Sequence, residues 1–260
     1  MRVRGVRLAS GEVIRALAVV MNADLLAATS RLIEPSAWPA DFAAKLDALE
    51  PATSMFSVHL AVRGAWPAIP PIVHLSSAGG QVEIVCPSHV DPTACPPGFS
   101  TVELMRLVPQ DEAREWFEAF AARTDGEVYK ARKTAEADKL IALAEEVVPD
   151  LGARIVGRWE ASPLTFTRYT RSTSGAVYGV RGASIAARSP VRGLVFAGSA
   201  THGAGFEAVT ISGASAAEAL LPGVLARGTA CKARAEWGEG VREAAWRLPG
   251  GERWRTSWGG

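Results

Sequence analysis

The chain has 260 residues, 48% of them hydrophobic, and its 28 Lys and Arg residues almost balance its 27 Asp and Glu residues. No apolar run approaches the roughly 18 uncharged residues of a membrane span, and the start lacks the apolar core of a secretory signal. The balanced charge argues against a nucleic-acid partner, and three cysteines form no paired framework, so we expect a soluble, cytoplasmic protein.

The first thirty residues predict a hairpin followed by a strand. Alternating residues 3–8 and 13–15 flank a turn at Ser10-Gly11. The apolar run 16–21 then predicts a strand buried on both faces, as in a parallel or mixed sheet. Asp24 is placed to cap a helix over 25–32, and a second short helix is expected over 41–49.

The middle of the chain predicts an antiparallel sheet with helices. Four apolar or alternating runs are separated by Pro and Gly, at 55–62, 72–75, 82–85 and 100–107. Helices are expected over 109–120 and 129–147, and the second has apolar residues at helical spacing. Short strand-like pieces follow at 155–159 and 165–169, before a glycine-rich crossing over 175–179.

The most informative segment runs from Gly193 to Gly213. It predicts a buried strand over 194–197, a glycine-rich turn over 198–205 and a helix of small residues over 208–221. Such a layout presents backbone N–H groups to an anionic or electron-rich ligand. A plain strand-to-helix connection is the alternative, and tight helix packing alone explains the small residues from Ser212 to Ala217.

Taken together, several segments resemble one family in its own order. The chain is similar to the C-terminal part of the phytoene desaturase, carotenoid isomerase and retinol saturase superfamily, a branch of the amine-oxidase-like flavoproteins. The matching segments are Gly5-Val-Arg-Leu-Ala-Ser-Gly-Glu12, Ala18-Val-Val-Met-Asn-Ala-Asp24, Ala137-Asp-Lys-Leu-Ile141, Val148-Pro-Asp-Leu151, Ser162-Pro-Leu-Thr-Phe-Thr-Arg-Tyr-Thr170, Gly179, Gly193-Leu-Val-Phe-Ala-Gly198, Thr201-His202 and Ser212-Gly213.

The resemblance implies an α/β fold with α+β character, in which a mixed or antiparallel sheet-plus-helix substrate domain is inserted into an incomplete FAD-binding domain. Residues 1–30 and 191–222 would form the FAD-binding part, residues 31–190 the substrate domain, and residues 223–260 a disordered Trp-rich tail. The implied cofactor is FAD, and the residues implied to bind it are Gly198, Ser199, Thr201, His202, Gly203, Gly205, Ala208 and Val209. His202 is also the candidate catalytic residue, with a structural hydrogen-bonding role as its alternative.

Members of this family open with a strand and a G-x-G-x-x-G turn that wraps the pyrophosphate of FAD. Near the start of this chain, Gly5 and Gly11 lie in the expected hairpin instead. We therefore expect either a truncated reading frame or a remodelled subunit, with a missing N-terminal half or a partner subunit to complete it. Glu207 departs from the family pattern, because a carboxylate near the turn would repel a phosphate.

His59, His74 and Tyr169 are the candidate substrate-binding residues. The alternative for the two histidines is a structural position in the core or the sheet, where the imidazole is hydrogen-bonded. The alternative for the run around Tyr169 is that Arg168 pairs with an acid on the surface. No metal is expected, because Cys86, His89 and Cys95 lack a fourth ligand and lie in what reads as an extended, proline-rich loop.

By resemblance, we expect an FAD-dependent oxidoreductase of the desaturase, saturase or isomerase type. Its substrate would be a lipophilic, polyene-like small molecule, and such a substrate suggests peripheral contact with a membrane. The alternatives are a non-catalytic subunit that binds lipophilic ligands on an incomplete flavoprotein scaffold, and a fragment without independent function.

Overall fold

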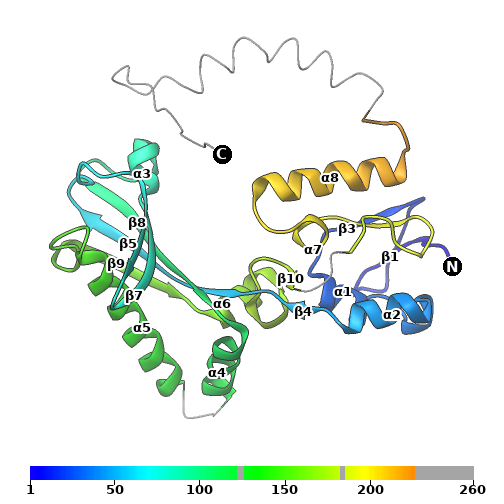
Figure 1. Cartoon of the computed structure of the whole chain (residues 1–260), viewed down its shortest axis with the longest axis horizontal. Coiled ribbons are helices and arrows are strands. Elements are labelled where there is room, and N and C mark those ends of the chain that lie inside the picture. The colour runs from blue at the N-terminus through cyan, green and yellow to red at the C-terminus, as the bar shows by residue number, and fades with distance from the viewer. Residues whose placement is uncertain (122–125, 182–184, 226–260) are drawn as a thin grey trace, which may run out of the picture.

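The computed structural model describes residues 1–121, 126–181 and 185–225, and it shows two hydrophobic cores joined by a short ribbon (Figure 1). The ribbon consists of β4 (Glu50–Pro51) and β10 (Val180–Arg181), which pair antiparallel. None of the described helices is long and apolar enough to cross a membrane. The predicted tail lies mostly outside the described residues, and so do its four tryptophans.

The larger core is built on a five-stranded antiparallel sheet with the strand order β6-β7-β8-β5-β9. All four strands predicted for the middle of the chain are confirmed, and the strand predicted at 155–159 joins them as the edge strand β9. The strands are β5 (Ser54–Arg63), β6 (Ile72–Ser77), β7 (Gly80–Val85), β8 (Phe99–Val108) and β9 (Ile155–Ala161).

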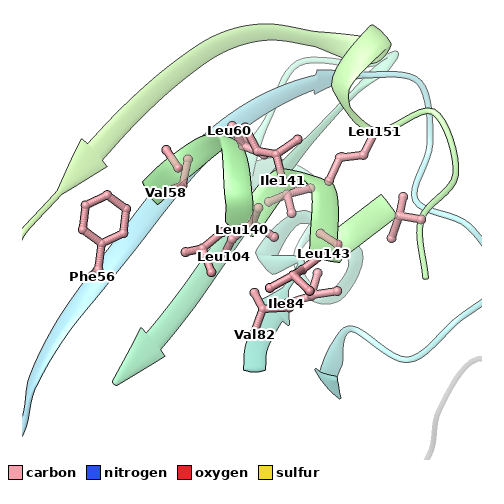
Figure 2. Close-up of a cluster of buried hydrophobic side chains, with 14 of the residues drawn as sticks. Phe56, Val58, Leu60, Val82, Ile84, Leu104, Leu140, Ile141, Leu143 and Leu151 are labelled. Carbon is pink, nitrogen blue, oxygen red and sulfur yellow. The ribbon is translucent and has the colours of Figure 1, made fainter. Parts of the chain in front are cut away.

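One face of this sheet is buried against helix α5 (Glu127–Glu145), and α4 (Gln110–Ala121) packs beside it. Alternate residues of β5, from Phe56 through Leu60, point into this core and meet Leu140 and Leu143 of α5 (Figure 2). Because each such side chain contributes about 1.5–3 kcal/mol when fully buried, this face holds the sheet together. Because successive strand residues point to opposite faces, the other face of the sheet carries the remaining side chains, and no described helix packs on it with an apolar core.

The second core surrounds a parallel pair of strands that are far apart in the sequence. β3 (Val19–Met21) pairs with β11 (Leu194–Phe196), so that Val20 lies opposite Val195. The strand after the front hairpin and the strand before the late glycine turn therefore lie in one sheet, whereas the hairpin itself forms a separate two-stranded sheet. The hairpin also forms as predicted, from β1 (Gly5–Arg7) and β2 (Val13–Arg15).

Helices cover part of this pair. They are α1 (Leu25–Arg31), α2 (Ala40–Asp47), the short α7 (Ser199–His202) and α8 (Phe206–Leu220). Asp24 caps α1 as expected, accepting a hydrogen bond of 2.8 Å from the backbone N–H of Ala27. Residues 31–49, which we assigned to the substrate domain, contribute Leu46 and Leu49 to this second core.

The strand β3 is shorter and less buried than predicted. It spans three residues instead of 16–21, Val20 is 52% exposed, and Leu17 before it is 85% exposed. The prediction of burial on both faces was wrong because, among the described residues, β3 pairs with β11 alone and has no second neighbour to cover it.

Three local predictions also need correction. Residues 165–169 are not strand-like but belong to the helix α6 (Pro163–Thr170), because Pro163 suits the first turn and Ser162 forms a capping box with Thr165. The proline-rich segment after Cys86 is not simply extended, since it forms the single-turn helix α3 (Pro87–Val90) and a 3₁₀ turn at Pro92–Ala94. The glycine turn contains α7, and α8 begins at Phe206 instead of at residue 208.

Candidate functional site

A cavity of about 350 Å³ lies where the parallel strands end, and we call it the junction cavity. Asn22 and Ala23 follow β3, and Ser199 and Ala200 follow β11, so both carboxyl ends open into it. The carboxyl edge of a parallel sheet is the usual ligand-binding position in α/β folds. The opposite wall comes from α6 and from the crossing segment, which includes Val177 and Gly179.

Close backbone approach holds the elements around the junction cavity together. Gly198 has a φ of +100°, and a Cβ there would collide with the Asn22 side chain. Its N–H donates a hydrogen bond of 2.7 Å to Ser212 Oγ, which lies 2.5 Å from Thr201 Oγ1. Gly179 also has a positive φ, and a Cβ there would lie 2.6 Å from Ser199 Oγ. Both positions therefore need glycine.

Asp24 ties the two cores together at this cavity. Besides capping α1, its Oδ1 accepts a hydrogen bond of 2.6 Å from Thr173 Oγ1. Thr173 opens the 3₁₀ turn Thr173–Gly175, from which the crossing segment 176–179 continues. The Asp24 carboxylate thus fixes the crossing segment relative to the end of β3.

The residues expected to bind FAD fall into three places. Ser199 lines the junction cavity, and Gly198 lies between its lining residues Ala197 and Ser199, against the Asn22 side chain. Thr201 is buried beneath it, bonded to Ser212. The remaining residues lie farther along, at the end of α7, on the exposed loop after it or in the first turn of α8, and they are His202, Gly203, Gly205, Ala208 and Val209.

The His202 imidazole bridges two elements. Its Nδ1 lies 3.2 Å from Thr201 Oγ1, and its Nε2 lies 3.2 Å from Ser215 Oγ. Both ring nitrogens therefore have hydroxyl partners, and the ring links α7 to α8. His202 does not line the junction cavity.

The loop after α7 carries the sequence Gly203-Ala-Gly-Phe-Glu-Ala208, which has the G-x-G-x-x-A spacing of a phosphate-binding turn. In that fingerprint the first glycine follows a strand directly, whereas here α7 intervenes between β11 and the loop. Glu207 also places a carboxylate in the first turn of α8. This loop is therefore a poor pyrophosphate site.

A second cavity, of about 700 Å³, opens on the uncovered face of the five-stranded sheet, and we call it the sheet cavity. Met55, Met105 and Leu107 supply apolar lining, and Tyr178 reaches it from the crossing segment. Cross-strand pairing places His74, Glu83 and Met105 in one row on this face.

Two imidazole–carboxylate pairs lie on the same face. His74 Nδ1 is 3.3 Å from a Glu83 oxygen, and His59 Nδ1 is 3.4 Å from a Glu103 oxygen. The side chains of His59 and His74 are 47% and 75% exposed, so neither is a core histidine, but both are sheet histidines with a carboxylate partner, in line with the other half of that alternative. The apolar neighbours that suggested burial in the sequence point to the opposite face of the sheet.

The other candidate residues lie apart from these cavities. Tyr169 is 76% exposed on α6, beside the Arg168 guanidinium, and lines neither cavity. His59 lies farther along the open sheet face, outside the lining of the sheet cavity. Cys86 is buried and Cys95 partly buried, and the described residues hold no cluster of three potential metal ligands.

Asn22 and Tyr178 are among the cavity residues that the sequence prediction missed. Asn22 follows the predicted strand directly, so its position at a carboxyl edge was a usable signal. Tyr178 carried no such signal, because its direction depends on how the crossing segment meets the sheet.

Both cavities share one wall. The crossing segment 176–179 presents Ala176, Val177 and Gly179 to the junction cavity, whereas Tyr178 lines the sheet cavity. A hydrogen bond of 3.1 Å from the Val177 N–H to the Thr53 carbonyl holds the segment at the start of β5. A molecule in one cavity would thus be separated from a molecule in the other by one stretch of backbone.

A partly buried charge cluster links the five-stranded sheet to the helices α4 and α5. Arg106 on β8 donates to Glu112 at 2.5 Å and also pairs with Glu136. Burial raises the pKa of Glu112, but hydrogen bonding and charge from Arg106 outweigh it and leave the pKa below its usual value. Burial lowers the pKa of Arg106, but its two glutamates leave it raised.

Comparison with known proteins identifies a family and solved structures that are similar to this chain. Residues 2–221 match the model of a family described as flavin containing amine oxidoreductase. No curated protein matches the chain. Among solved structures, an oxidoreductase from Methanosarcina mazei is similar with a TM-score of 0.51 and 16% identity, over 80% of this chain and 44% of that one.

Cyclohexylamine oxidase from Brevibacterium oxydans IH-35A is similar to the same degree, with a TM-score of 0.51, 16% identity and the same coverage. The chain thus spans less than half the length of these two proteins, and the likeness concerns the fold. The family model covers most of the chain and implies a flavin as cofactor. The chain belongs to the family of flavin-containing amine oxidoreductases.

Proposed function

We propose that this chain provides two parts of an FAD-dependent oxidoreductase: the substrate-binding surface, at the sheet cavity, and the part of the flavin site at the junction cavity. The substrate is a lipophilic, polyene-like molecule, and the reaction is of the desaturase, saturase or isomerase type. The observation that carries the proposal is the shared wall, because the crossing segment 176–179 lines both cavities.

The junction cavity suits the ring end of a flavin. Its volume of about 350 Å³ falls within the usual range of small-molecule sites, about 300–1,000 Å³. The small residues Ala23, Gly179 and Ala200 leave room for a flat ring, and Asn22 and Ser199 offer polar groups at its edge. These residues would hold the ring.

The pyrophosphate of FAD needs another site. In the part of the chain that the structure describes, the candidate with phosphate-turn spacing is the G-x-G-x-x-A loop before α8, which Glu207 makes unfavourable for a phosphate. We propose that polypeptide outside these residues, either an N-terminal half or a partner subunit, supplies the phosphate-binding turn.

A bound flavin supplies hydride transfer to or from a substrate carbon. The chain itself contributes placement and exclusion of water. Met55, Met105, Leu107 and Tyr178 provide an apolar surface for a lipophilic molecule at the wall next to the junction cavity. Such chemistry requires orientation more than acid–base groups, and we assign no obligatory proton donor.

Flavin titrations test the junction cavity. Riboflavin and FAD should bind the purified chain with similar affinity, because the chain offers the ring a cavity but the pyrophosphate no turn. Ala23→Trp, at an exposed residue lining the cavity, should abolish both, whereas Ala9→Trp in the hairpin turn should change neither. Absence of binding, or equal binding by both variants, would contradict the proposal.

A fluorescent polyene tests the sheet cavity. Retinol should bind the chain, and Tyr178→Ala should weaken binding about tenfold, as expected for loss of roughly 1.4 kcal/mol of aromatic contact. Tyr169→Ala is the matched control and should leave binding unchanged. Retinol binding without any flavin binding would favour the alternative of a non-catalytic lipophile-binding subunit.

Glu83 favours a second candidate, oxidation of a lipophilic amine. Its carboxylate lines the sheet cavity beside apolar residues, an arrangement that accommodates an ammonium group on an apolar body. Cyclohexylamine oxidase, one of the similar structures, acts on such an amine by its name. Under this candidate, Glu83→Gln should weaken binding of cyclohexylamine and leave retinol binding unchanged.

A further inference from the structure

A third cavity, of about 670 Å³, lies beside the ribbon that joins the two cores, and we call it the ribbon cavity. Glu50, Pro51 and Arg181 line it from the ribbon itself, and Ser174 lines it from the 3₁₀ turn before the crossing segment. Another wall is formed by α4. The volume falls within the usual range of small-molecule sites, which occur preferentially where two folded units meet.

One face of α4 points into the ribbon cavity. Gln110, Arg114 and Phe117 follow one another at intervals of four and three residues, so they lie on one side of the helix. Asp111, next to Gln110, lines the cavity as well. The Gln110 side chain donates a hydrogen bond to the Ala52 carbonyl, and this bond holds the start of α4 at the ribbon.

Two charged groups in the ribbon cavity have no ion pair. Glu50 and Arg181 neutralise each other across the ribbon. Arg114 and Asp111, by contrast, form no ion pair with each other or with any other residue that the structure describes. The cavity therefore offers an available cation and an available anion side by side.

Two hydroxyl groups in the cavity are available too. Neither Thr53 Oγ1 nor Ser174 Oγ hydrogen-bonds to another residue within the ranges 1–121, 126–181 and 185–225. Ser174 also has a φ of +52°, which is uncommon for a residue with a side chain. Such backbone conformations are often found at ligand sites.

We propose that the ribbon cavity binds a free α-amino acid with an apolar side chain. Arg114 offers paired donors to a carboxylate, and Asp111 accepts hydrogen bonds from an ammonium group. Residues three apart on a helix have Cβ atoms about 5–6 Å from each other, which suits two charges carried by one carbon atom. Phe117 provides apolar contact for the side chain of the ligand.

A ligand with one charge fits this cavity less well, because it would leave either Arg114 or Asp111 unmatched. A bound amino acid would connect α4 to the ribbon and to Ser174, from which the chain continues through Gly175 into segment 176–179. Since a ligand that binds only the folded chain stabilises it, the amino acid should also raise the Tm. The proposal does not depend on flavin binding.

Calorimetric titration with L-phenylalanine tests this proposal on the wild-type chain. L-Phenylalanine should bind at a single site. 3-Phenylpropionate lacks the ammonium group and phenethylamine lacks the carboxylate, so each should bind at least about tenfold more weakly, as expected for loss of one charge-assisted hydrogen bond. Glycine, which lacks the apolar side chain, should also bind more weakly.

Single variants identify the residues. Arg114→Gln and Asp111→Asn should each weaken L-phenylalanine binding about tenfold, because each removes one charged partner of the ligand. The matched controls are Lys139→Gln and Glu118→Gln, which remove the same charges at exposed residues outside the cavity and should bind within about twofold of wild type. Circular dichroism should show all four variants folded.

Three results would overturn the proposal. They are no binding of L-phenylalanine to the wild-type chain, binding of 3-phenylpropionate or phenethylamine as tight as that of L-phenylalanine, and equal losses in the cavity variants and their controls. The second result would assign the cavity to a ligand with one charge.

Discussion

Gly175→Ala probes how the shared wall between the two cavities is held in place. Gly175 has a φ of +69°, and a Cβ there would lie 2.9 Å from Pro163 Cα and C and collide with the Pro163 carbonyl oxygen. The residue is also buried, and its own carbonyl accepts a hydrogen bond of 2.7 Å from Ser54 Oγ. Because backbone atoms oppose the new methyl group, the segment cannot adjust by rotating a side chain.

The cost has two parts. Left-handed backbone in a non-glycine residue costs about 1–2 kcal/mol, and overpacking adds about 1–3 kcal/mol. Gly126→Ala is the matched control, since its φ of +72° is close to that of Gly175 but nothing lies within 4 Å of its Cβ. We expect Gly175→Ala to lower the free energy of unfolding by about 2 kcal/mol more than the control.

Thermal unfolding followed by circular dichroism measures this difference, which corresponds to about 4–8 °C in Tm for a protein of this size. Gly175→Ala should also weaken retinol binding, because Tyr178 moves with the segment, whereas Gly126→Ala should not. Equal losses of stability in the two variants would refute the reasoning, since they would show that Pro163 does not restrict the segment.

Three further predictions concern stability. Phe56→Ala in the buried face of β5 should cost about 3–5 kcal/mol in urea unfolding, and Trp159→Ala on the open face less than about 0.5 kcal/mol; similar costs would contradict the assignment of the two faces. Ser212→Ala removes the acceptor of a backbone N–H under the junction cavity and should cost about 1–3 kcal/mol; a smaller cost in the same assay would mean that the N–H finds another partner. Because Arg106 lowers the pKa of Glu112, that pair stabilises the fold above the ordinary pKa of 4.5 and loses this contribution as pH falls through the lowered value. The free energy of unfolding of Glu112→Gln, measured in urea, should therefore depend less on pH below about 4.5 than that of the wild type. An unchanged pH dependence would exclude the pair as its source.

Hydrophobic periodicity was sufficient to predict most elements of the larger core. The alternation in 55–62 and 100–107 directs Phe56 and Leu104 to one face, and that face becomes the core. Strands were also predicted at the positions of β3 and β11, from an apolar run and a glycine turn at opposite ends of the described chain, whereas their parallel pairing comes from the structure. These signals are local in sequence, or follow from strong strand preference.

The errors arose where local chemistry or tertiary contacts decide the structure. Residues 165–169 have strand-like composition, but the capping box at Ser162 and the proline at 163 start a helix. The exposure of His74 could not be read from its apolar neighbours, because those neighbours face the other side of the sheet. Tyr178 reaches the sheet cavity only through the path of the crossing segment, which depends on Gly175 and Thr173.

Energy transfer between two bound ligands tests the account most directly. Retinol emission overlaps the absorption of flavins, so retinol in the sheet cavity should be strongly quenched when riboflavin occupies the junction cavity on the other side of segment 176–179. We predict strong quenching in the wild-type chain and none in Ala23→Trp, which should bind retinol alone. Simultaneous binding of both ligands without energy transfer would contradict the claim that the two cavities are neighbours in one site.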